Sequence, residues 1–337
     1  MTELNIAVVG ALGAVGREML KTLAQRRFPA KTVKALDIAE NVGKTIPFND
    51  GNISVELCCK DAFSDVDVAF FAVGDGVSRK LAPEAVEMGA IVIDNSSAWR
   101  MDPEVPLIVP ECNAEDLRNH KGIIANPNCS TIIAMVPLKP LSDSAGLKRI
   151  VASTYQAVSG AGIAGLDELS LQTREVLDGK AAHPEVFAHQ IAFNLIPHID
   201  YFEENAYTHE EMKMTREGRK ILNLPNLMVS CTCVRVPVYR SHSEAITIET
   251  ERKLTADEAR HILTNAPGVK LYDDPGKNEY PMPLDTSNGD DIWVGRIRED
   301  ISADNSLVFW CCGDQIRKGA ALNAVQIGEK LIEFGLV

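Results

Sequence analysis

The sequence predicts an α/β protein: a Rossmann-type doubly wound parallel sheet, followed by a second α+β domain with a mixed or antiparallel sheet. At the N-terminus an apolar run, a glycine-rich turn and an amphipathic segment follow one another. Strand and helix candidates then alternate up to about residue 125, which is the pattern of a parallel sheet. Beyond residue 129 the strand candidates are longer and alternate in polarity, which favours a different kind of sheet.

The stretch NIAVVGALGAVGREMLKTL, residues 5–23, indicates a strand, a glycine turn and a helix. Backbone N–H groups of such a loop can approach a pyrophosphate closely, and the helix N-terminus adds a partial positive charge. A simple tight turn would also use these glycines, but their place between a strand and a helix favours dinucleotide binding. The expected cofactor contacts in this loop are Gly10, Leu12, Gly13, Ala14, Val15 and Gly16.

Further strand candidates support a parallel sheet in the first part of the chain. They are residues 32–37, 53–59, 67–74 and 90–97, and a helical segment, residues 81–89, separates the last two. Ligand loops in such folds lie at the carboxyl ends of the strands. Gly74, Asn95 and Ser96 fall at these ends, so we expect them near the cofactor.

The second part of the chain changes in character. A strand runs into a glycine loop over residues 150–162, a helix follows over 166–179, and the longer strands are 227–239, 244–250 and 306–315. A helical tail, residues 319–334, should pack back on the first domain. We therefore expect a dinucleotide-binding domain over 1–128, completed by a C-terminal helix over 317–337, and a catalytic and dimerisation domain over 129–316.

Length and charge restrict the class of protein. A chain of 337 residues with 45% hydrophobic composition exceeds the roughly 250 to 300 residues that one core supports, which also predicts two domains. The net charge of −13, without any basic patch, opposes binding to nucleic acids or anionic membranes. No apolar run approaches the roughly 20 residues of a membrane span, and the start MTELN lacks a signal-peptide layout. We expect a soluble, cytoplasmic protein.

The spacing of the eight cysteines argues against a metal site and against disulfides. Cys58 and Cys59 are adjacent, as are Cys311 and Cys312, and no C-x-x-C occurs. Most of these side chains should be small buried apolar groups in a reducing compartment.

Cys129 is a different case because it follows the turn-forming residues 126–128 and precedes an apolar run. It should lie at a helix N-terminus, where unpaired N–H groups favour the thiolate. A nucleophilic cysteine needs a base. His242, which follows a strand end in a polar turn, is the best candidate among seven histidines.

Six motifs in order give the chain a family resemblance. They are GALGAVG at 10–16, DNSSAWRM at 94–101, ANPNCST at 125–131, TYQAVSGAG at 154–162, EEMKM at 210–214 and VRVPVYRSHSE at 234–244. Together they resemble the aspartate-β-semialdehyde dehydrogenase family over nearly the whole chain. The family reduces L-aspartyl-4-phosphate to L-aspartate 4-semialdehyde through a thioacyl-enzyme, in lysine, threonine and methionine biosynthesis.

The resemblance implies a role for each matching residue. Cys129 would be the nucleophile, His242 the acid/base catalyst and Gln156 the group that orients the substrate. Arg235 would bind the α-carboxylate and Glu210 the ammonium group. The residues implied in phosphate binding are Arg100, Asn128 and Lys213, and those implied in cofactor binding are Ser159, Gly160 and Asn323.

Simpler interpretations of these residues stay open at this stage. Glu210 and Lys213 could lie on a solvated helix face. Arg235 could be an exposed strand residue paired with a carboxylate. Gln156 could belong to a tight turn.

The cofactor-specificity region departs from the family pattern. Many members carry small residues and an arginine after the second strand, suited to the 2′-phosphate of NADP, whereas this chain has LDIAENVGK. Asp37 stands where an acidic group hydrogen-bonds a ribose 2′-OH, and Glu40 adds a second negative charge. NADP is the family's usual cofactor, but these residues favour NAD. Leu12 replaces a common threonine, while Lys44 could still reach a phosphate.

Two other functions remain as alternatives. A related acyl-phosphate reductase of the N-acetylglutamyl-phosphate type would not need the ammonium-binding Glu210. A non-catalytic nucleotide sensor would not need Cys129, Gln156, Arg235 and His242 together. The family forms dimers through its second domain, so we expect a homodimer.

Overall fold

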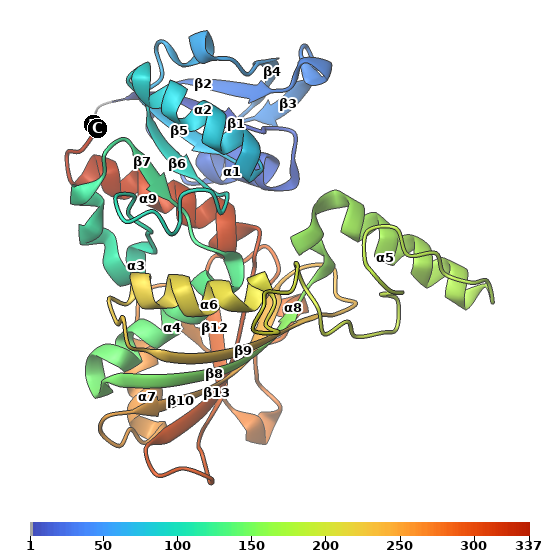
Figure 1. Ribbon diagram of the computed structural model, residues 1–337, viewed down its shortest axis with the longest axis vertical. Coiled ribbons are helices and arrows are strands. Elements are labelled where there is room, and N and C mark those ends of the chain that lie inside the picture. The colour runs from blue at the N-terminus through green and yellow to red at the C-terminus, as the bar shows by residue number, and fades with distance from the viewer. Residues whose placement is uncertain (1–2) are drawn as a thin grey trace. The chain divides into compact units, whose positions relative to one another are not determined.

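The computed structural model describes residues 3–337, and the chain divides into two compact units (Figure 1). The first consists of the chain up to Asn128 together with Ala320–Val337, and the second is Cys129–Gly319. Residues 317–319, which we expected in the first domain, therefore group with the second unit. The reason is close packing: a Cβ built on Gly319 would lie 2.9 Å from Cβ of Cys129.

The first unit is built on a seven-stranded sheet with the order β3-β4-β2-β1-β5-β6-β7. All neighbouring strands are parallel except β3 and β4, which confirms the doubly wound class. The strands are β1 (Leu4–Val9), β2 (Ala30–Asp37), β3 (Thr45–Phe48), β4 (Gly51–Leu57), β5 (Val68–Phe71), β6 (Ile91–Asp94) and β7 (Ile123–Ala125). The helices are α1 (Ala14–Gln25), α2 (Asp75–Glu87), α3 (Pro110–Asn113) and α9 (Leu322–Glu333).

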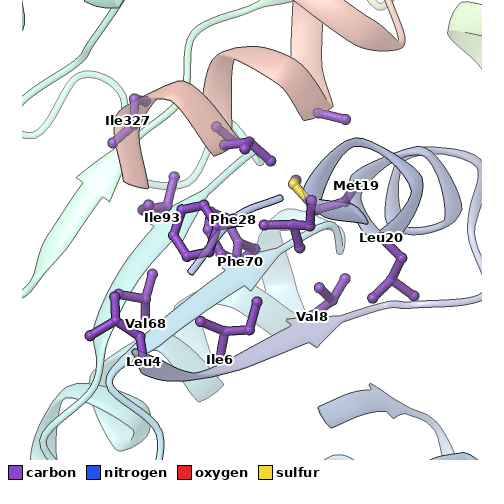
Figure 2. Close-up of a cluster of buried hydrophobic side chains, with 14 of the residues drawn as sticks. Leu4, Ile6, Val8, Met19, Leu20, Phe28, Val68, Phe70, Ile93 and Ile327 are labelled. Atoms are coloured by element: carbon purple, nitrogen blue, oxygen red, sulfur yellow. The ribbon is translucent and has the colours of Figure 1, made fainter. Parts of the chain in front are cut away.

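Alternate residues of the central strands supply the two faces of this sheet. Ile6 and Val8 of β1 pack with Phe70 of β5 against α1 and α9, as Figure 2 shows for Met19 and Ile327. Ala7, which lies between Ile6 and Val8 in β1, packs on the other face of the sheet, which α2 covers. This alternation follows from the two-residue period of a strand, so the fully apolar strands are covered on both faces.

The second unit is built on a six-stranded mixed sheet with the order β11-β12-β13-β10-β8-β9. The pairs β8–β9 and β11–β12 are parallel and the others antiparallel. Its strands are β8 (Leu147–Gln156), β9 (Met228–Arg235), β10 (His242–Thr250), β11 (Val269–Leu271), β12 (Ile292–Glu299) and β13 (Ser306–Gly313). Its helices are α4 (Cys129–Ala145), α5 (Gly162–Leu177), α6 (His209–Ile221), α7 (Ala256–Thr264) and α8 (Pro283–Thr286).

The mixed α+β class predicted for this unit is confirmed, and α4 explains how its sheet is covered. Ten consecutive residues, from Cys129 to Leu138, are apolar apart from Ser130 and Thr131, so this helix is buried nearly all round. A helix with no polar face needs neighbours on every side. The neighbours of α4 include β8, β10, β12, β13, α6 and α7.

None of the helices within residues 3–337 combines the length and apolar character required to cross a bilayer. All eight cysteines lie within these residues and are free thiols. Four of them, Cys231, Cys233, Cys311 and Cys312, are buried as expected, whereas Cys59 is exposed.

Candidate active site

Cys129 is the first residue of α4, which confirms the expected helix N-terminus. The segment before it, residues 126–128, has no helical conformation, so the helix starts at the cysteine itself. The first N–H groups of a helix have no partner within it and carry a partial positive charge. The Sγ atom of Cys129 lies 3.4 Å from Nε2 of His242. The structure thus brings together the two residues that the sequence could not place in space.

His242 is the first residue of β10 and is fully buried. The prediction that His242 lies in a polar turn was wrong: the turn ends at Ser241, and His242 belongs to the strand that follows. Burial lowers the pKa of the imidazole to about 3, and the neighbouring guanidinium of Arg235 contributes, while Glu210 opposes the shift. The ring is therefore neutral at physiological pH.

Arg235 ends β9 and is buried, so the interpretation as an exposed strand residue is excluded. Its Nη1 atom donates a hydrogen bond of 2.8 Å to the carbonyl of Ala157, and the guanidinium lies 5.8 Å from the centre of the Phe187 ring. A Cβ on Gly160 would lie 2.7 Å from this Nη1. Glycine at position 160 therefore leaves the space that the guanidinium occupies.

Gln156, Glu210 and Lys213 form a chain of polar contacts beside these residues. Nε2 of Gln156 donates to Glu210 over 3.0 Å, and Lys213 donates to the other Glu210 oxygen over 3.0 Å and to Asp200 over 2.9 Å. Burial alone would lower the pKa of Lys213, but the carboxylates of Glu210 and Asp200 outweigh it and raise that pKa. Both Glu210 and Gln156 are buried, so neither belongs to a solvated helix face or an open turn.

The second unit therefore holds a thiol, a neutral imidazole, two cations and a carboxylate within one connected group. A thiol at a helix N-terminus can attack an acyl carbon. A guanidinium suits a carboxylate, and a carboxylate suits an ammonium group. Such a set can bind an amino acid while a nucleophile acts on its side chain.

The glycine turn of the first unit forms a cradle that only glycine permits. Gly10 has φ of +77°, and a Cβ on it would lie 2.4 Å from the carbonyl oxygen of Ala72. A Cβ on Gly16 would lie 2.1 Å from the carbonyl oxygen of Gly10. The backbone can therefore pack closely while Gly13 caps α1. This fits a dinucleotide at the helix N-terminus.

Asp37, at the end of β2, is tied to this turn. Its carboxylate accepts hydrogen bonds from the backbone N–H groups of Leu12 at 3.0 Å and Ile38 at 2.8 Å, and from Asn41 Nδ2 at 2.9 Å. Burial favours the neutral acid, but these hydrogen bonds outweigh it and hold the pKa below its usual value. Asp37 thus carries a negative charge beside the turn. Lys44 donates to Asn41 over 2.6 Å.

The remaining expected residues of the first unit sit in a buried polar network. Arg100 donates to the carbonyls of Asn126 at 3.0 Å and Asn95 at 2.8 Å. Asn323 on α9 donates to Asn126 Oδ1 over 2.7 Å and to the carbonyl of Ile108. These contacts position the side chains of Arg100 and Asn323, whose expected roles in phosphate and cofactor binding stay predictions. Asn128 is also buried.

Ser159 and Gly160 follow β8, where Ser159 accepts a hydrogen bond from Gln315, and Gln315 in turn accepts one from the backbone N–H of Ser241. No pattern in the sequence marked Gln315. None marked Asp200, the second partner of Lys213, or Glu244, a fully buried carboxyl group on β10. Within residues 3–337, no three histidine, cysteine or carboxylate side chains group as metal ligands would.

Known proteins share both the sequence and the structure of this chain. Family models described as the NAD binding domain and the dimerisation domain of semialdehyde dehydrogenases match residues 5–120 and 138–318. The chain is 50% identical to the aspartate-semialdehyde dehydrogenase of Aquifex aeolicus and 47% identical to that of Bacillus subtilis, with 99% of each chain covered in both cases. The crystal structure of aspartate semialdehyde dehydrogenase II from Vibrio cholerae, complexed with ASA, matches with a TM-score of 0.96 at 44% identity over 99% of both chains.

The glycine cradle in one unit and the Cys129–His242 pair in the other define an oxidoreductase of the semialdehyde dehydrogenase class, which uses a nicotinamide cofactor. Within that class, the chain belongs to the aspartate-semialdehyde dehydrogenase family.

Proposed function

We propose that this protein reduces L-aspartyl-4-phosphate to L-aspartate 4-semialdehyde with release of phosphate. The observation that carries the proposal is the 3.4 Å approach of Cys129 Sγ to His242 Nε2 in a group that also holds Arg235 and Glu210. The Cys129 thiolate attacks the acyl carbon, a C–S bond forms and the C–O bond to phosphate breaks. The first unit would hold a nicotinamide nucleotide at its glycine turn, and this cofactor would supply the hydride for reduction of the thioester.

During these steps His242 acts as the acid/base group for the former carbonyl oxygen of the substrate. When the thiohemiacetal collapses, the C–S electron pair returns to Cys129 and the aldehyde leaves. Nε2 of His242 faces Cys129, so this nitrogen also faces the carbon that Cys129 attacks. A donor placed there stabilises negative charge that develops on the former carbonyl oxygen.

The substrate groups match the charges around Cys129. Arg235 would bind the α-carboxylate bidentately, Glu210 the ammonium group and Gln156 the reacting carbonyl. Lys213, the remaining cation of the group, would bind the phosphate. The family resemblance gives a phosphate-binding role to Arg100 and Asn128 as well. Because Glu210 already contacts Lys213 at 3.0 Å, the incoming ammonium and phosphate would divide an existing ion pair.

The test is a steady-state assay of the purified protein in the reverse direction, with aspartate semialdehyde, phosphate and either NAD or NADP. Turnover should be lost in a Cys129→Ala variant while the variant still binds the cofactor. Turnover of N-acetylglutamate semialdehyde instead of aspartate semialdehyde would identify the related reductase. Cofactor binding without turnover of either substrate would identify a nucleotide sensor and contradict the proposal.

We infer that NAD is preferred over NADP. Asp37 is held ionised beside the glycine turn, and a carboxylate there suits a ribose 2′-OH. Glu40 is exposed in the next turn, where it would repel a 2′-phosphate. Lys44 donates to Asn41, and this contact competes with a phosphate for its ammonium group.

We also propose that the protein works as a homodimer in the cytoplasm. The match of residues 138–318 to a dimerisation domain supports the dimer. The eight free thiols support a reducing compartment, because thiols in oxidising compartments tend to pair.

A further inference from the structure

We propose that Thr154 is a positioning residue for Gln156. Its hydroxyl group holds the side-chain amide of Gln156 so that the amide nitrogen, and not the amide oxygen, is presented to the reacting carbonyl of the substrate. This inference rests on the proposed function, in which Gln156 binds that carbonyl, and adds the residue that orients Gln156. Thr154 acts on the reaction only through Gln156.

The pairing of the strands places Thr154 next to Gln156 on the side of the sheet that carries the site. The two residues belong to β8 and are two positions apart, so their side chains lie on the same face. On β9, Gln156 pairs with Arg235 and Thr154 pairs with Cys233, while Glu244 of β10 lies opposite Thr154. Both Thr154 and Gln156 are buried. Thr154 therefore belongs to the row of residues next to the row that holds Arg235 and Gln156.

The chemistry of the neighbouring groups fixes the direction of the hydrogen bond between Thr154 and Gln156. Nε2 of Gln156 donates to the carboxylate of Glu210 over 3.0 Å, and this carboxylate is also the ion-pair partner of Lys213. A carboxylate only accepts hydrogen bonds, so the amide nitrogen must face Glu210 and the amide oxygen must face Thr154. The amide oxygen also only accepts, so the hydroxyl of Thr154 donates to it over 3.1 Å.

This orientation leaves an N–H group for the substrate. An amide nitrogen carries two hydrogens, and Glu210 accepts one of them. The other can donate to the carbonyl oxygen that becomes negatively charged during the reaction, and a donor at this position stabilises that charge. With the amide turned over, its oxygen would face both the carboxylate of Glu210 and the developing oxyanion, and both contacts would be repulsive.

The contact with Glu210 alone does not secure this orientation during turnover. Glu210 is the group proposed to bind the ammonium group of the substrate, so the surroundings of its carboxylate change when the substrate binds. Thr154 is buried behind Gln156 on β8, and its hydrogen bond to Oε1 of Gln156 is made within the sheet. This bond therefore holds the amide in the same orientation before and after the substrate binds.

A double-mutant cycle tests whether Thr154 acts through Gln156. Thr154→Val keeps the shape of the side chain and removes the hydroxyl group. We expect kcat with aspartate semialdehyde to fall by about threefold to tenfold, the range that one hydrogen bond supports. KM should change by less than about twofold, because the amide acts mainly on charge that develops in the transition state. In a Gln156→Ala background the same substitution should leave kcat unchanged. An equal fall in both backgrounds would overturn the inference.

Two further variants separate the hydroxyl group from the general stability of the sheet. Thr154→Ser retains the donor and should keep kcat within about twofold of the unaltered protein. Thr250→Val makes the same change at another buried threonine of this sheet, whose hydroxyl donates to the carbonyl of Arg252 over 2.7 Å. It should lose stability in urea unfolding without a change in kcat. A fall in kcat as large as that of Thr154→Val in either variant would contradict the role of Thr154.

NMR of the resting protein carrying ¹⁵N-labelled glutamine tests the same bond without any substrate. The side-chain signals of Gln156 are assigned by their loss in Gln156→Ala. We expect slow exchange of these protons with solvent in the unaltered protein, and exchange about threefold to tenfold faster in Thr154→Val. Unchanged exchange in a folded Thr154→Val variant would overturn the inference. If that variant does not fold, exchange in the unaltered protein as fast as that of an exposed glutamine would overturn it. Failure of the proposed function would instead appear as an absence of turnover in the unaltered protein.

Discussion

Glu244 is a fully buried carboxyl group, and its neighbours on the adjacent strands form no hydrogen bond with it. It lies opposite Cys311 of β13 and Thr154 of β8. Among the residues that the structure describes, neither of its oxygens has a hydrogen-bond partner. Burial raises the pKa of Glu244 well above 4.5, and the negative charge of Glu210 adds to the effect. The neutral acid is therefore the favoured form in the folded protein.

This predicts that Glu244→Gln stabilises the protein, and more so at higher pH. The raised folded-state pKa means that the unfolded chain loses its proton first, so the stability that Glu244 contributes is complete below about pH 4.5 and falls as the pH rises. Glutamine has no proton to lose. The free energy of unfolding of the variant should exceed that of the unaltered protein by about 1 to 3 kcal/mol more near pH 8 than near pH 5.

Urea unfolding at the two pH values measures this difference. A gap between the two proteins that does not change with pH, or that narrows as the pH rises, would show that Glu244 is ionised in the folded state.

The negative charge of Glu40 is expected to disfavour NADP relative to NAD, and a substitution at this residue tests that effect. Replacing it with arginine places a cation where a 2′-phosphate would lie, and a charged hydrogen bond contributes about 1.5 to 3 kcal/mol. Glu40→Arg should therefore raise the ratio of kcat/KM for NADP to that for NAD by about tenfold or more.

Steady-state kinetics with both cofactors measure this ratio. Glu204→Arg is the control, because it makes the same change in charge at an exposed position of the second unit. An equal rise in both variants would attribute the effect to net charge and not to the site.

At the scale of elements, α6 presents two residues of the site from its first turns. The helix begins with a capping box: Thr208 accepts from the N–H of Glu211, and the Glu211 side chain accepts from the N–H of Thr208. The other oxygen of Glu211 accepts from the backbone N–H of Cys233 on β9 over 2.9 Å. This box therefore fixes the start of α6 against the sheet, and with it Glu210 and Lys213.

We predict that Thr208→Ala costs about 1 kcal/mol of stability, as expected for a lost cap, and also raises KM for aspartate semialdehyde. The matched control is Thr255→Ala, since Thr255 and Glu258 form the same capping box on α7. Both variants should lose similar stability in urea unfolding, and only Thr208→Ala should bind substrate more weakly. If KM changed equally in both, the cap of α6 would have no specific role in the site.

Sequence patterns predicted best the elements that have a clear hydrophobic period or a clear turn signal at one end. The helix start at Cys129 follows from a polar turn before an apolar run, and α1 follows from glycines before an amphipathic run. The strands β11 and β12 were not predicted. β12 has charged residues among its apolar ones, IWVGRIRE, and its register with β13 shifts between Gly295 and Arg298, so no simple alternation marks it.

At the scale of the whole molecule, we expect a homodimer in which the second unit of one chain binds the second unit of another. We predict a particle of about twice the chain mass of 36.7 kDa, since most soluble oligomers are symmetric dimers. Light scattering coupled to size-exclusion chromatography measures the mass, over a dilution series that covers the concentration of the assay. A mass of one chain at concentrations where turnover persists would show that the monomer is active.

Patterns local in the chain sufficed for the two-domain organisation, the glycine turn, the helix that begins at Cys129 and the resemblance that named the reacting residues. These features depend on neighbours within a few residues, where periodicity and turn chemistry act. Tertiary structure alone decided that Cys129 meets His242 across 113 positions of sequence, that Arg235 is buried, that Lys213 pairs with Glu210 and Asp200, and that the amide of Ala157 faces Nδ1 of the imidazole. Such contacts depend on the pairing of distant strands, and burial then determines protonation because it removes the water that would stabilise charge.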